Sequence, residues 1–171
     1  KARRVFDSRG NPTIEVDIFT NNNIGRAMSP SGASTGSSEA IELRDKDNMF
    51  GGKDIKNGIK LINNEIKNLL IGANCLDQKN FDFILNSYDS TKLKKKIGGN
   101  VSIALSLANY ICASNVLNKP LYEYSSTNKK FKIPIPEIQI FGGGAHAGNI
   151  LSFQDFLIFS PKEIDILKFY E

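Results

Sequence analysis

The stretch TIEVDIFTNNNIGRAMS, residues 13–29, predicts how the fold begins. Ile14, Val16 and Ile18 alternate with acidic residues, and this period of two is typical of a half-buried β-strand. The asparagines that follow tolerate a positive φ angle and favour a tight turn. Because the segment IGRAMS can return as a second strand, we expect a β-hairpin with one apolar face.

A loop of small residues, SPSGASTGSSEA at residues 29–40, follows the hairpin. Its backbone N–H groups and hydroxyls can hold an anion or complete a metal shell, although the ending of a Walker A loop is missing. A plain flexible connector is the alternative interpretation. We expect the loop to lead into a helix, with Ser38 as its N-cap and Glu39 near the positive end of its dipole.

Several helices are expected after this loop. Residues 57–72 place apolar side chains three and four positions apart, as an amphipathic helix does, and end at Gly72. The other expected helices are residues 77–89 behind a capping aspartate, residues 100–117 as an apolar and buried helix, and residues 120–126 with Pro120 as the first helical residue.

The pattern changes after the polar stretch STNKKFK. Residues 135–141 and 153–159 have the composition of strands, and a helix is expected from Pro161 onward. We therefore expect two domains. The first is an α+β domain of a sheet and helices at residues 1–131, and the second is the opening of a different domain at residues 132–171.

The composition is that of a soluble globular protein: of 171 residues, 40% are hydrophobic and 23% are charged, with a net charge of +4. No apolar run could span a bilayer and no secretory signal is visible, so we expect a cytoplasmic protein without membrane contact. The lysines at residues 92–96 are interpreted as a solvated face, and no nucleic-acid partner is expected because no reading motif accompanies them. Cys75 and Cys112 lack metal-site spacing and are expected to be free, buried thiols.

The single histidine lies in the stretch IFGGGAHAGNILSFQDFLIF, residues 140–159. The surrounding glycines let the backbone bend and approach a ligand closely, and His146 can transfer a proton near neutral pH or bind an anion. Gln154 and Asp155 are neighbours on a predicted strand, so their side chains should point to opposite faces. The alternative is a surface histidine in a flexible glycine-rich loop.

A third stretch, DSRGNPT at residues 7–13, contains turn-forming residues around Arg9. The guanidinium of Arg9 could pair with a carboxylate or a phosphate. We favour the interpretation of a structural turn whose arginine staples the hairpin.

Three motifs in this order, DSRGNPTIEV, PSGASTG with SEAIELRD, and HAGN with QDF, resemble the enolase family. The segments GGNVSIALSLA and KPLYEY are also similar to enolase motifs, so the resemblance extends over nearly the whole chain. It implies an α+β N-terminal cap domain followed by the start of a TIM-type barrel, truncated here, whose first two strands form a hairpin. It also implies a homodimer that pairs through the N-terminal domain.

The resemblance implies a lyase of glycolysis, phosphopyruvate hydratase, which dehydrates the phosphorylated small molecule 2-phosphoglycerate to phosphoenolpyruvate with Mg²⁺. Enolase-superfamily enzymes use magnesium to stabilise the ene-diolate formed when a base removes the proton beside a carboxylate. By similarity Ser34 is a ligand of the second magnesium, and His146 is catalytic and contacts the phosphate side of the substrate. Gln154 binds the substrate, and Asp155, which is catalytic and substrate-binding, stands where the family usually has glutamate.

The chain departs from the family motif around the histidine. Asp155 is one methylene shorter than glutamate, which moves its carboxylate by roughly 1–1.5 Å and can cost about 10²-fold in rate. The family's N-G-G-S-H is replaced by glycines at 142–144 and Ala145 before His146. Two alternatives stay open: a superfamily paralogue acting on a related 2-hydroxy acid phosphate or carboxylate, and a non-catalytic binding surface at lysines 92–96.

A complete barrel needs about 250 residues, far more than follow the predicted boundary. The base lysine, the acid glutamate and the carboxylate ligands that the resemblance implies lie outside this sequence. We therefore expect the chain by itself to be inactive and its active site to be incomplete.

Overall fold

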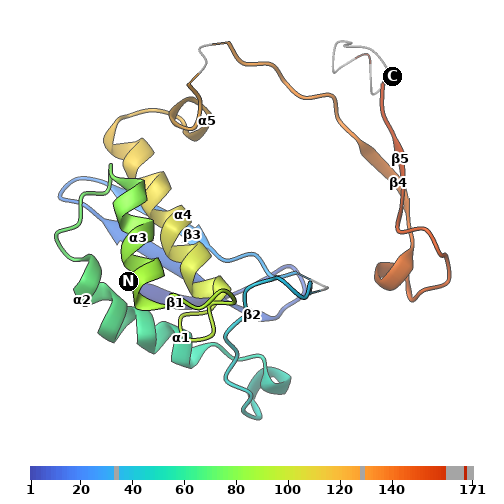
Figure 1. Ribbon diagram of the computed structural model, residues 1–171. Coiled ribbons are helices and arrows are strands. Elements are labelled where there is room, and N and C mark those ends of the chain that lie inside the picture. The colour runs from blue at the N-terminus through green and yellow to red at the C-terminus, as the bar shows by residue number, and fades with distance from the viewer. Residues whose placement is uncertain (33–34, 128–129, 161–167, 169–171) are drawn as a thin grey trace. The chain divides into compact units, whose positions relative to one another are not determined.

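A computed structural model describes residues 1–32, 35–127, 130–160 and residue 168 of the chain. The chain divides into two compact units, Lys1–Thr127 and Asn128–Glu171 (Figure 1). Each unit is described by itself. The domain limits expected from the sequence, at residues 131 and 132, stay a prediction.

The first unit contains an antiparallel three-stranded sheet in the order β1-β2-β3. Its strands are β1 (Ala2–Phe6), β2 (Pro12–Phe19) and β3 (Ile24–Met28). The predicted hairpin corresponds to β2 and β3 and is confirmed. Strand β1 was not predicted, because its two adjacent arginines hide the alternation that marks a strand.

Ion pairs across the strands explain why β1 forms. Arg3 and Arg26 both bind the carboxylate of Asp17, with Arg26 Nε 2.7 Å from Asp17 Oδ1. The register places Asp17 opposite Arg26 and Glu15 opposite Arg3. The hydrogen bond from Arg3, followed by that from Arg26, holds the pKa of Asp17 far below its usual range. An acid on the polar face of β2 is therefore almost fully buried, with only 4% of its surface exposed.

Helices cover the apolar face of the sheet (Figure 1). A continuous helical segment comprises α1 (Lys56–Leu61), the π-helical stretch η2 (Ile62–Ile66) and α2 (Lys67–Leu70), which confirms the helix predicted there. It is followed by α3 (Gln78–Tyr88) and α4 (Gly99–Val116), also as predicted. The capping role of Asp77 is confirmed, since its side chain accepts the Asn80 N–H at 3.0 Å.

The core lies between α4 and the sheet. Ile14 and Val16 of β2 pack with Val101, Leu105 and the small residues of α4, and all of these are buried. Strand β3 approaches α4 so closely that a β-carbon on Gly25 would lie 2.1 Å from the Ala108 carbonyl oxygen. The helix and the strand therefore touch backbone to backbone at this point.

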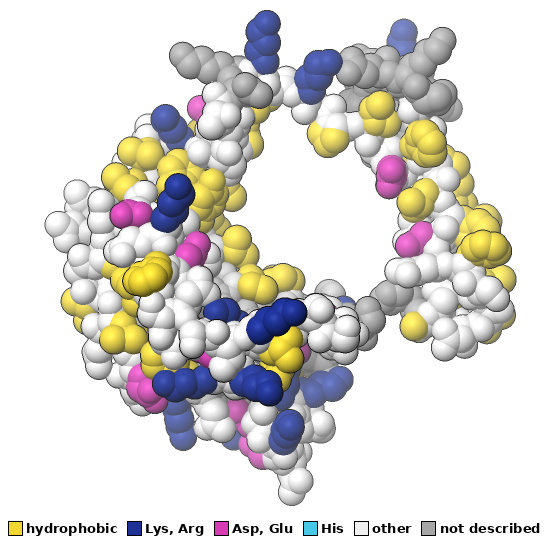
Figure 2. Space-filling view, in the orientation of Figure 1, with side chains coloured by type: hydrophobic (Ala, Val, Ile, Leu, Met, Phe, Trp, Pro, Cys, Tyr) yellow, Lys and Arg dark blue, Asp and Glu magenta, His cyan; other side chains and the backbone are white. Residues whose placement is uncertain are grey.

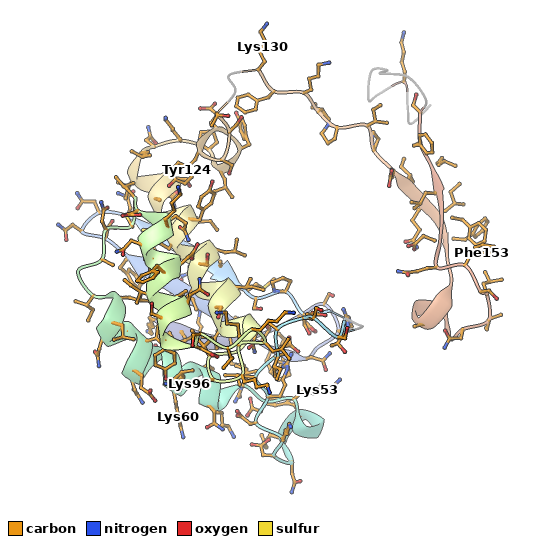
Figure 3. The ribbon with its side chains drawn as sticks, in the orientation of Figure 1. Lys53, Lys60, Lys96, Tyr124, Lys130 and Phe153 are labelled. Atoms are coloured by element: carbon orange, nitrogen blue, oxygen red, sulfur yellow. The ribbon has the colours of Figure 1, made fainter. Side chains whose placement is uncertain are left out.

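The C-terminal end of the first unit is a short helix, α5 (Leu121–Tyr124). Pro120 was predicted to be the first residue of this helix, but it is the residue just before it. The ring of Tyr124 packs 4.7 Å from that of Tyr110 on α4 (Figure 3). Cys75 and Cys112 are free and buried, as predicted, and burial raises the pKa of the Cys112 thiol.

The helix predicted to begin at Ser38 is absent, and this prediction was wrong. Residues 41–43 belong to neither a helix nor a strand, and the Ile41 N–H binds the Leu93 carbonyl at 2.8 Å. Asn100 on α4 both donates to and accepts from the Leu43 backbone. These partners are distant in sequence, and a local capping pattern cannot reveal them. The Glu39 carboxylate accepts the Gly36 N–H at 2.9 Å instead of stabilising a helix end.

A buried carboxylate organises the turn between α3 and α4. Asp89 accepts the backbone N–H groups of Thr91, Lys96 and Ile97. Burial opposes its ionisation, but these hydrogen bonds and that of the Thr91 hydroxyl prevail, and the pKa of Asp89 lies far below normal. This turn also carries the lysines of residues 92–96.

The second unit contains an antiparallel hairpin of β4 (Ile138–Gly142) and β5 (Asp155–Ile158). Both strands were predicted, although they are shorter than expected. The pairing shifts register between Gln139 and Phe141, and a 3₁₀ turn, η3 (Gly144–Ala147), lies in the connection. Apart from residue 168, the helix expected from Pro161 onward lies outside the described residues. Within the described parts of the chain, no helix is both long and apolar enough to cross a bilayer.

Replacing Gly25 by alanine tests the contact between β3 and α4. We expect the free energy of unfolding to fall by about 3 kcal/mol, because the added methyl group forces backbone apart. Gly36→Ala is the matched control, since the nearest atom to its β-carbon is Glu39 Oε2 at 4.0 Å. Urea denaturation of both variants measures the difference, and equal losses would contradict the packing argument.

Acid should destabilise the first unit through Asp17 and Asp89. Their pKa values are lowered from 3.8, so their stabilisation is complete above that value and is lost as the pH falls. We expect the urea midpoint to decrease from about pH 5 to about pH 2. In Asp17→Asn the decrease should be smaller, because one titrating group is gone. An unchanged pH profile in this variant would rule out Asp17 as a cause.

Candidate active site

Two arginines hold the base of the loop that follows β3. Arg9 donates to the carbonyl oxygens of Ser31 at 3.1 Å and Gly32 at 3.5 Å. Arg44 donates to the Ser31 hydroxyl of this loop at 3.5 Å, and to the carbonyl oxygens of Pro12 at 2.6 Å and Lys53 at 2.7 Å. Arg9 thus has a structural role, as the favoured interpretation predicted. It binds the loop after β3, however, and not the hairpin itself.

The turn that presents Arg9 is stabilised by Asp7. Its carboxylate accepts the backbone N–H groups of Asn11 and Arg9, both at 2.8 Å. The hydrogen bond from Asn11 is the largest of the effects that lower the pKa of Asp7. The stretch DSRGNPT therefore forms a side-chain-capped turn that carries an arginine to the loop.

A cleft of about 540 Å³ lies between this loop and the start of α4. Its polar lining includes Thr35, Glu39, Glu42, Arg44 and Asn100. The guanidinium of Arg44 is already engaged by two carbonyl oxygens and by the Glu42 carboxylate at 3.0 Å. With two carboxylates and no uncommitted cation among these residues, the cleft by itself offers little attraction to a phosphorylated anion.

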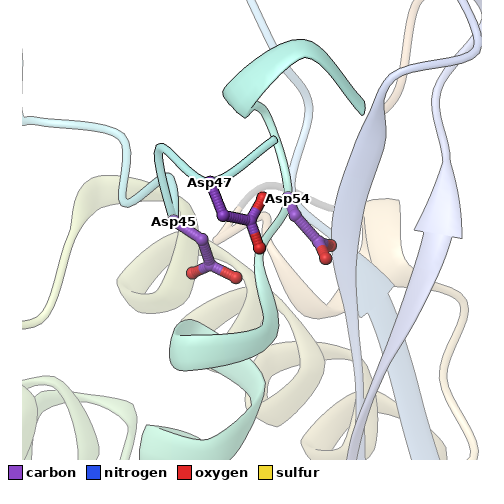
Figure 4. Close-up of side chains that lie close together, drawn as sticks. All are labelled: Asp45, Asp47 and Asp54. Carbon is purple, nitrogen blue, oxygen red and sulfur yellow. The ribbon is translucent and has the colours of Figure 1, made fainter. Parts of the chain in front are cut away.

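Three carboxylates, Asp45, Asp47 and Asp54, lie close together (Figure 4). Asp45 accepts the N–H groups of Lys56 at 2.7 Å and Asn57 at 3.1 Å, at the start of α1. Asp47 accepts the Met49 N–H at 2.9 Å. Each of these acids therefore already has a protein donor.

Asp54 is the buried member of this acidic cluster. It pairs with Arg4 at 2.7 Å and with Lys56 at 3.3 Å, and it accepts the Ile55 N–H at 2.8 Å. Burial opposes its ionisation, but the Ile55 hydrogen bond and the two cations prevail and lower the pKa of Asp54. Lys56 thus supplies the positive charge that a metal ion would otherwise bring.

Glycines determine the shape of the connection between β4 and β5. A β-carbon on Gly143 would lie 2.0 Å from the Phe153 carbonyl oxygen, so a larger residue does not fit there. The Gly143 N–H binds the Gln154 carbonyl at 2.6 Å, and the Gly144 N–H binds the Leu151 carbonyl at 3.0 Å. Gly144 has a φ angle of 59°, which favours glycine. The glycines let the connection fold back on β5.

The predicted site residues are described to different extents. Asp155 is the first residue of β5 and Gln154 lies just before that strand. The Asp155 carboxylate accepts a hydrogen bond from the Gln139 side chain on β4. The backbone of His146 lies in η3, but its side chain and all of Ser34 lie outside the described residues. The approach of Ser34 to the other site residues therefore stays a prediction.

Two residues near the site were missed by sequence reasoning. Gln139 donates a hydrogen bond to Asp155. The sequence places Gln139 in the strand predicted at residues 135–141, but no role was predicted for it. Arg44 stands in the quoted SEAIELRD motif, yet its acceptors are carbonyl groups from distant segments. Alternation along the strands places Gln139 on a definite face, whereas no local pattern indicates the contacts of Arg44.

Comparison with known proteins decides the family. The family model described as "Enolase, N-terminal domain" matches residues 1–125. The chain belongs to the enolase family. It is 44% identical over 171 residues to the enolase of Methanosarcina acetivorans. The matched region covers 99% of this chain and 39% of that enolase.

Other enolases give the same result. The enolase of Mycoplasmopsis synoviae is 44% identical over 92% of this chain and 36% of its own length. That of Pyrococcus furiosus is 43% identical, again over 92% of this chain and 36% of its own length. The chain thus spans less than two fifths of the curated enolases that it matches, and the small sheet with its helices is the α+β N-terminal domain of an enolase.

Two of the lysines at residues 92–96 of this enolase domain contact side chains or backbone groups of their own turn and of α3. Lys94 donates to the Asn86 side chain at 2.6 Å and to the Asp89 carbonyl at 2.8 Å. The Lys96 ammonium, on the residue labelled in Figure 3, lies 4.0 Å from the centre of the Tyr88 ring. Two of these lysines therefore stabilise their own turn, which weakens the alternative of a docking patch.

Magnesium is not expected to stabilise this chain through the acidic cluster of Asp45, Asp47 and Asp54. We expect its thermal midpoint to stay the same when millimolar Mg²⁺ is added, because protein donors already occupy these carboxylates. Asp54→Asn should lower the midpoint in either condition, since Arg4 then loses its buried partner. A rise with Mg²⁺ that Asp47→Asn abolishes would instead identify a metal site.

Proposed function

We propose that the polypeptide containing this chain catalyses the Mg²⁺-dependent dehydration of 2-phosphoglycerate to phosphoenolpyruvate, a step of glycolysis. The observation that carries this proposal is the match to enolases along the whole chain, at 44% identity to the Methanosarcina acetivorans protein. On this proposal the chain is the cap domain and the opening of the barrel. By itself it has an incomplete site and no activity.

The second unit supports the idea of an unfinished barrel. None of the apolar side chains in its described residues is among the buried ones, and Phe153 is 71% exposed (Figures 2 and 3). A two-stranded hairpin is at best marginally stable in water. We propose that β4 and β5 are the first strands of a TIM-type barrel, whose remaining strands and helices cover these side chains.

Each of the site residues has a role in the proposal. Gln154 binds the substrate, and Asp155 is a catalytic and substrate-binding carboxylate. His146 acts from the glycine-rich connection, where its imidazole can exchange a proton near neutral pH or bind the phosphate side of the substrate. Ser34, which belongs by sequence to the segment after β3, is proposed as a magnesium ligand.

Magnesium, when bound, would stabilise the negative charge that develops when the substrate loses its proton. Mg²⁺ prefers oxygen ligands, and the Ser34 hydroxyl is a donor of that kind. The acidic cluster beside β1 does not fit this role, because Lys56 and backbone N–H groups already bind it. The carboxylate ligands must therefore come from the rest of the protein.

A second candidate function is that of a superfamily paralogue with a related substrate. It is favoured by Asp155 in place of glutamate and by the glycines at residues 142–144. A related 2-hydroxy acid phosphate or carboxylate would then react by the same proton abstraction. For either function we also propose a cytoplasmic protein that forms a homodimer through its N-terminal domain.

A chimaera tests the proposed function. In it, this chain replaces the matching part of the Methanosarcina acetivorans enolase, which supplies the remainder of the barrel. We expect Mg²⁺-dependent conversion of 2-phosphoglycerate, followed by the ultraviolet absorbance of the enol product, while the chain alone has no activity. Ser34→Ala should raise the Mg²⁺ concentration needed for the half-maximal rate by about 10-fold or more, as for other losses at a metal site.

Ser38→Ala is the matched control, because this exposed serine lies on the same loop and has no proposed role. The proposal would fail if a folded chimaera left 2-phosphoglycerate unchanged. Turnover of a different 2-hydroxy acid by that chimaera would support the paralogue instead.

A further inference from the structure

Two positions that depart from the enolase motif lie next to the side chain of Gln139. Gly142 stands where the family has asparagine, and Asp155 stands where it usually has glutamate. These positions are directly opposite each other in the β4–β5 hairpin. The side chain of Gln139 lies between them, because its amide nitrogen donates a hydrogen bond to the Asp155 carboxylate.

The missing side chain at Gly142 makes room for this amide. A β-carbon on Gly142 would lie 3.2 Å from Gln139 Nε2 and 4.0 Å from Gln139 Cδ. The 3.2 Å contact is tighter than ordinary packing, so the glutamine amide would have to shift by a few tenths of an ångström, and the rest of an asparagine side chain would add to the crowding. The absence of a side chain at residue 142 therefore favours this position of the glutamine amide.

The register of the hairpin brings the two polar side chains to one face. Gln139 is paired with Leu157, and Asp155 lies two residues away from Leu157 on the same strand. Residues two apart on a strand share a face, and diagonal neighbours are within reach of long side chains. The shift of register between Gln139 and Phe141 lies within this arrangement.

We propose that Gln139 is a positioning residue that compensates for the shortened acid at position 155. Glutamine is long enough to reach the carboxylate of an aspartate across the strands, and its amide holds that carboxylate in one orientation. The catalytic consequence rests on the proposed function, in which Asp155 acts on the substrate. The departures at residues 142 and 155 are then two parts of one rearrangement, not independent losses.

The proposal predicts that one methylene can be moved between the two side chains. Asp155→Glu alone makes the pair too long, and Gln139→Asn alone makes it too short. In the active chimaera, each single change should lower kcat by about 10²-fold, the scale expected for a misplacement near 1 Å. The double variant should recover to within about threefold of the parent, because the summed length is restored.

Matched controls separate positioning from general damage. Gln78→Asn removes a methylene from a glutamine in the first unit, so it should not restore the rate of Asp155→Glu. The KM for substrate should change less than kcat in Gln139→Asn, since this residue acts through Asp155 and does not touch the substrate. Purely multiplicative losses in the double variant would overturn the proposal.

A second measurement is independent of activity. In the 171-residue chain, the side-chain amide signals of Gln139 should shift in the nuclear magnetic resonance spectrum when Asp155 becomes asparagine. Those of Gln154, the neighbour of Asp155, should shift less. If the chimaera is inactive, the proposed function fails and this measurement alone decides the contact. Equal or absent shifts would then overturn the inference.

Discussion

Helix α4 and strand β3 touch backbone to backbone, and the first unit is arranged around this contact. No side chain fits at Gly25, where a β-carbon would be 2.1 Å from the Ala108 carbonyl oxygen and 2.3 Å from the Cys112 nitrogen. Burial of apolar residues from the helix and the sheet provides the main favourable free energy. Because α4 is fixed in this way, Asn100 at its start binds the backbone of Leu43. The helix thus fixes the segment that returns from the Ser34 loop.

Charged groups complete this unit where apolar packing ends. Asp17, Asp54 and Asp89 are all buried, and each is held by cations or by backbone N–H groups. A buried carboxylate without such partners would be strongly destabilising. The same reasoning explains why the acidic cluster at Asp54 is structural. It joins β1 to the start of α1 through Arg4 and Lys56, and the Mg²⁺ binding proposed above falls to other residues.

The hairpin unit differs from the first unit in its packing. Its backbone approaches itself closely at glycines such as Gly143, but its apolar side chains are exposed (Figure 2). The described residues of this unit therefore form a hairpin without a buried apolar core. It can present Gln139, Gln154 and Asp155 in a fixed relation, since hydrogen bonds close the connection on itself and the Gln139 amide binds Asp155. The proposed enolase activity would then need the rest of the barrel both for stability and for ligands.

The sequence by itself determined the elements whose signals are local. Alternation predicted β2, and the asparagine turn predicted the return strand β3. Apolar spacing predicted the helix around Ile62, a continuously apolar segment predicted the helix around Leu105, the Asp77 cap predicted the start of α3, and the motifs predicted the family. Tertiary structure alone decided the rest. It formed β1 through the ion pair of Arg3 with Asp17, and it held Leu43 in a non-helical segment through Asn100. It also joined Gln139 to Asp155. The physical reason is that these contacts link residues far apart along the chain, so that no short pattern contains both partners.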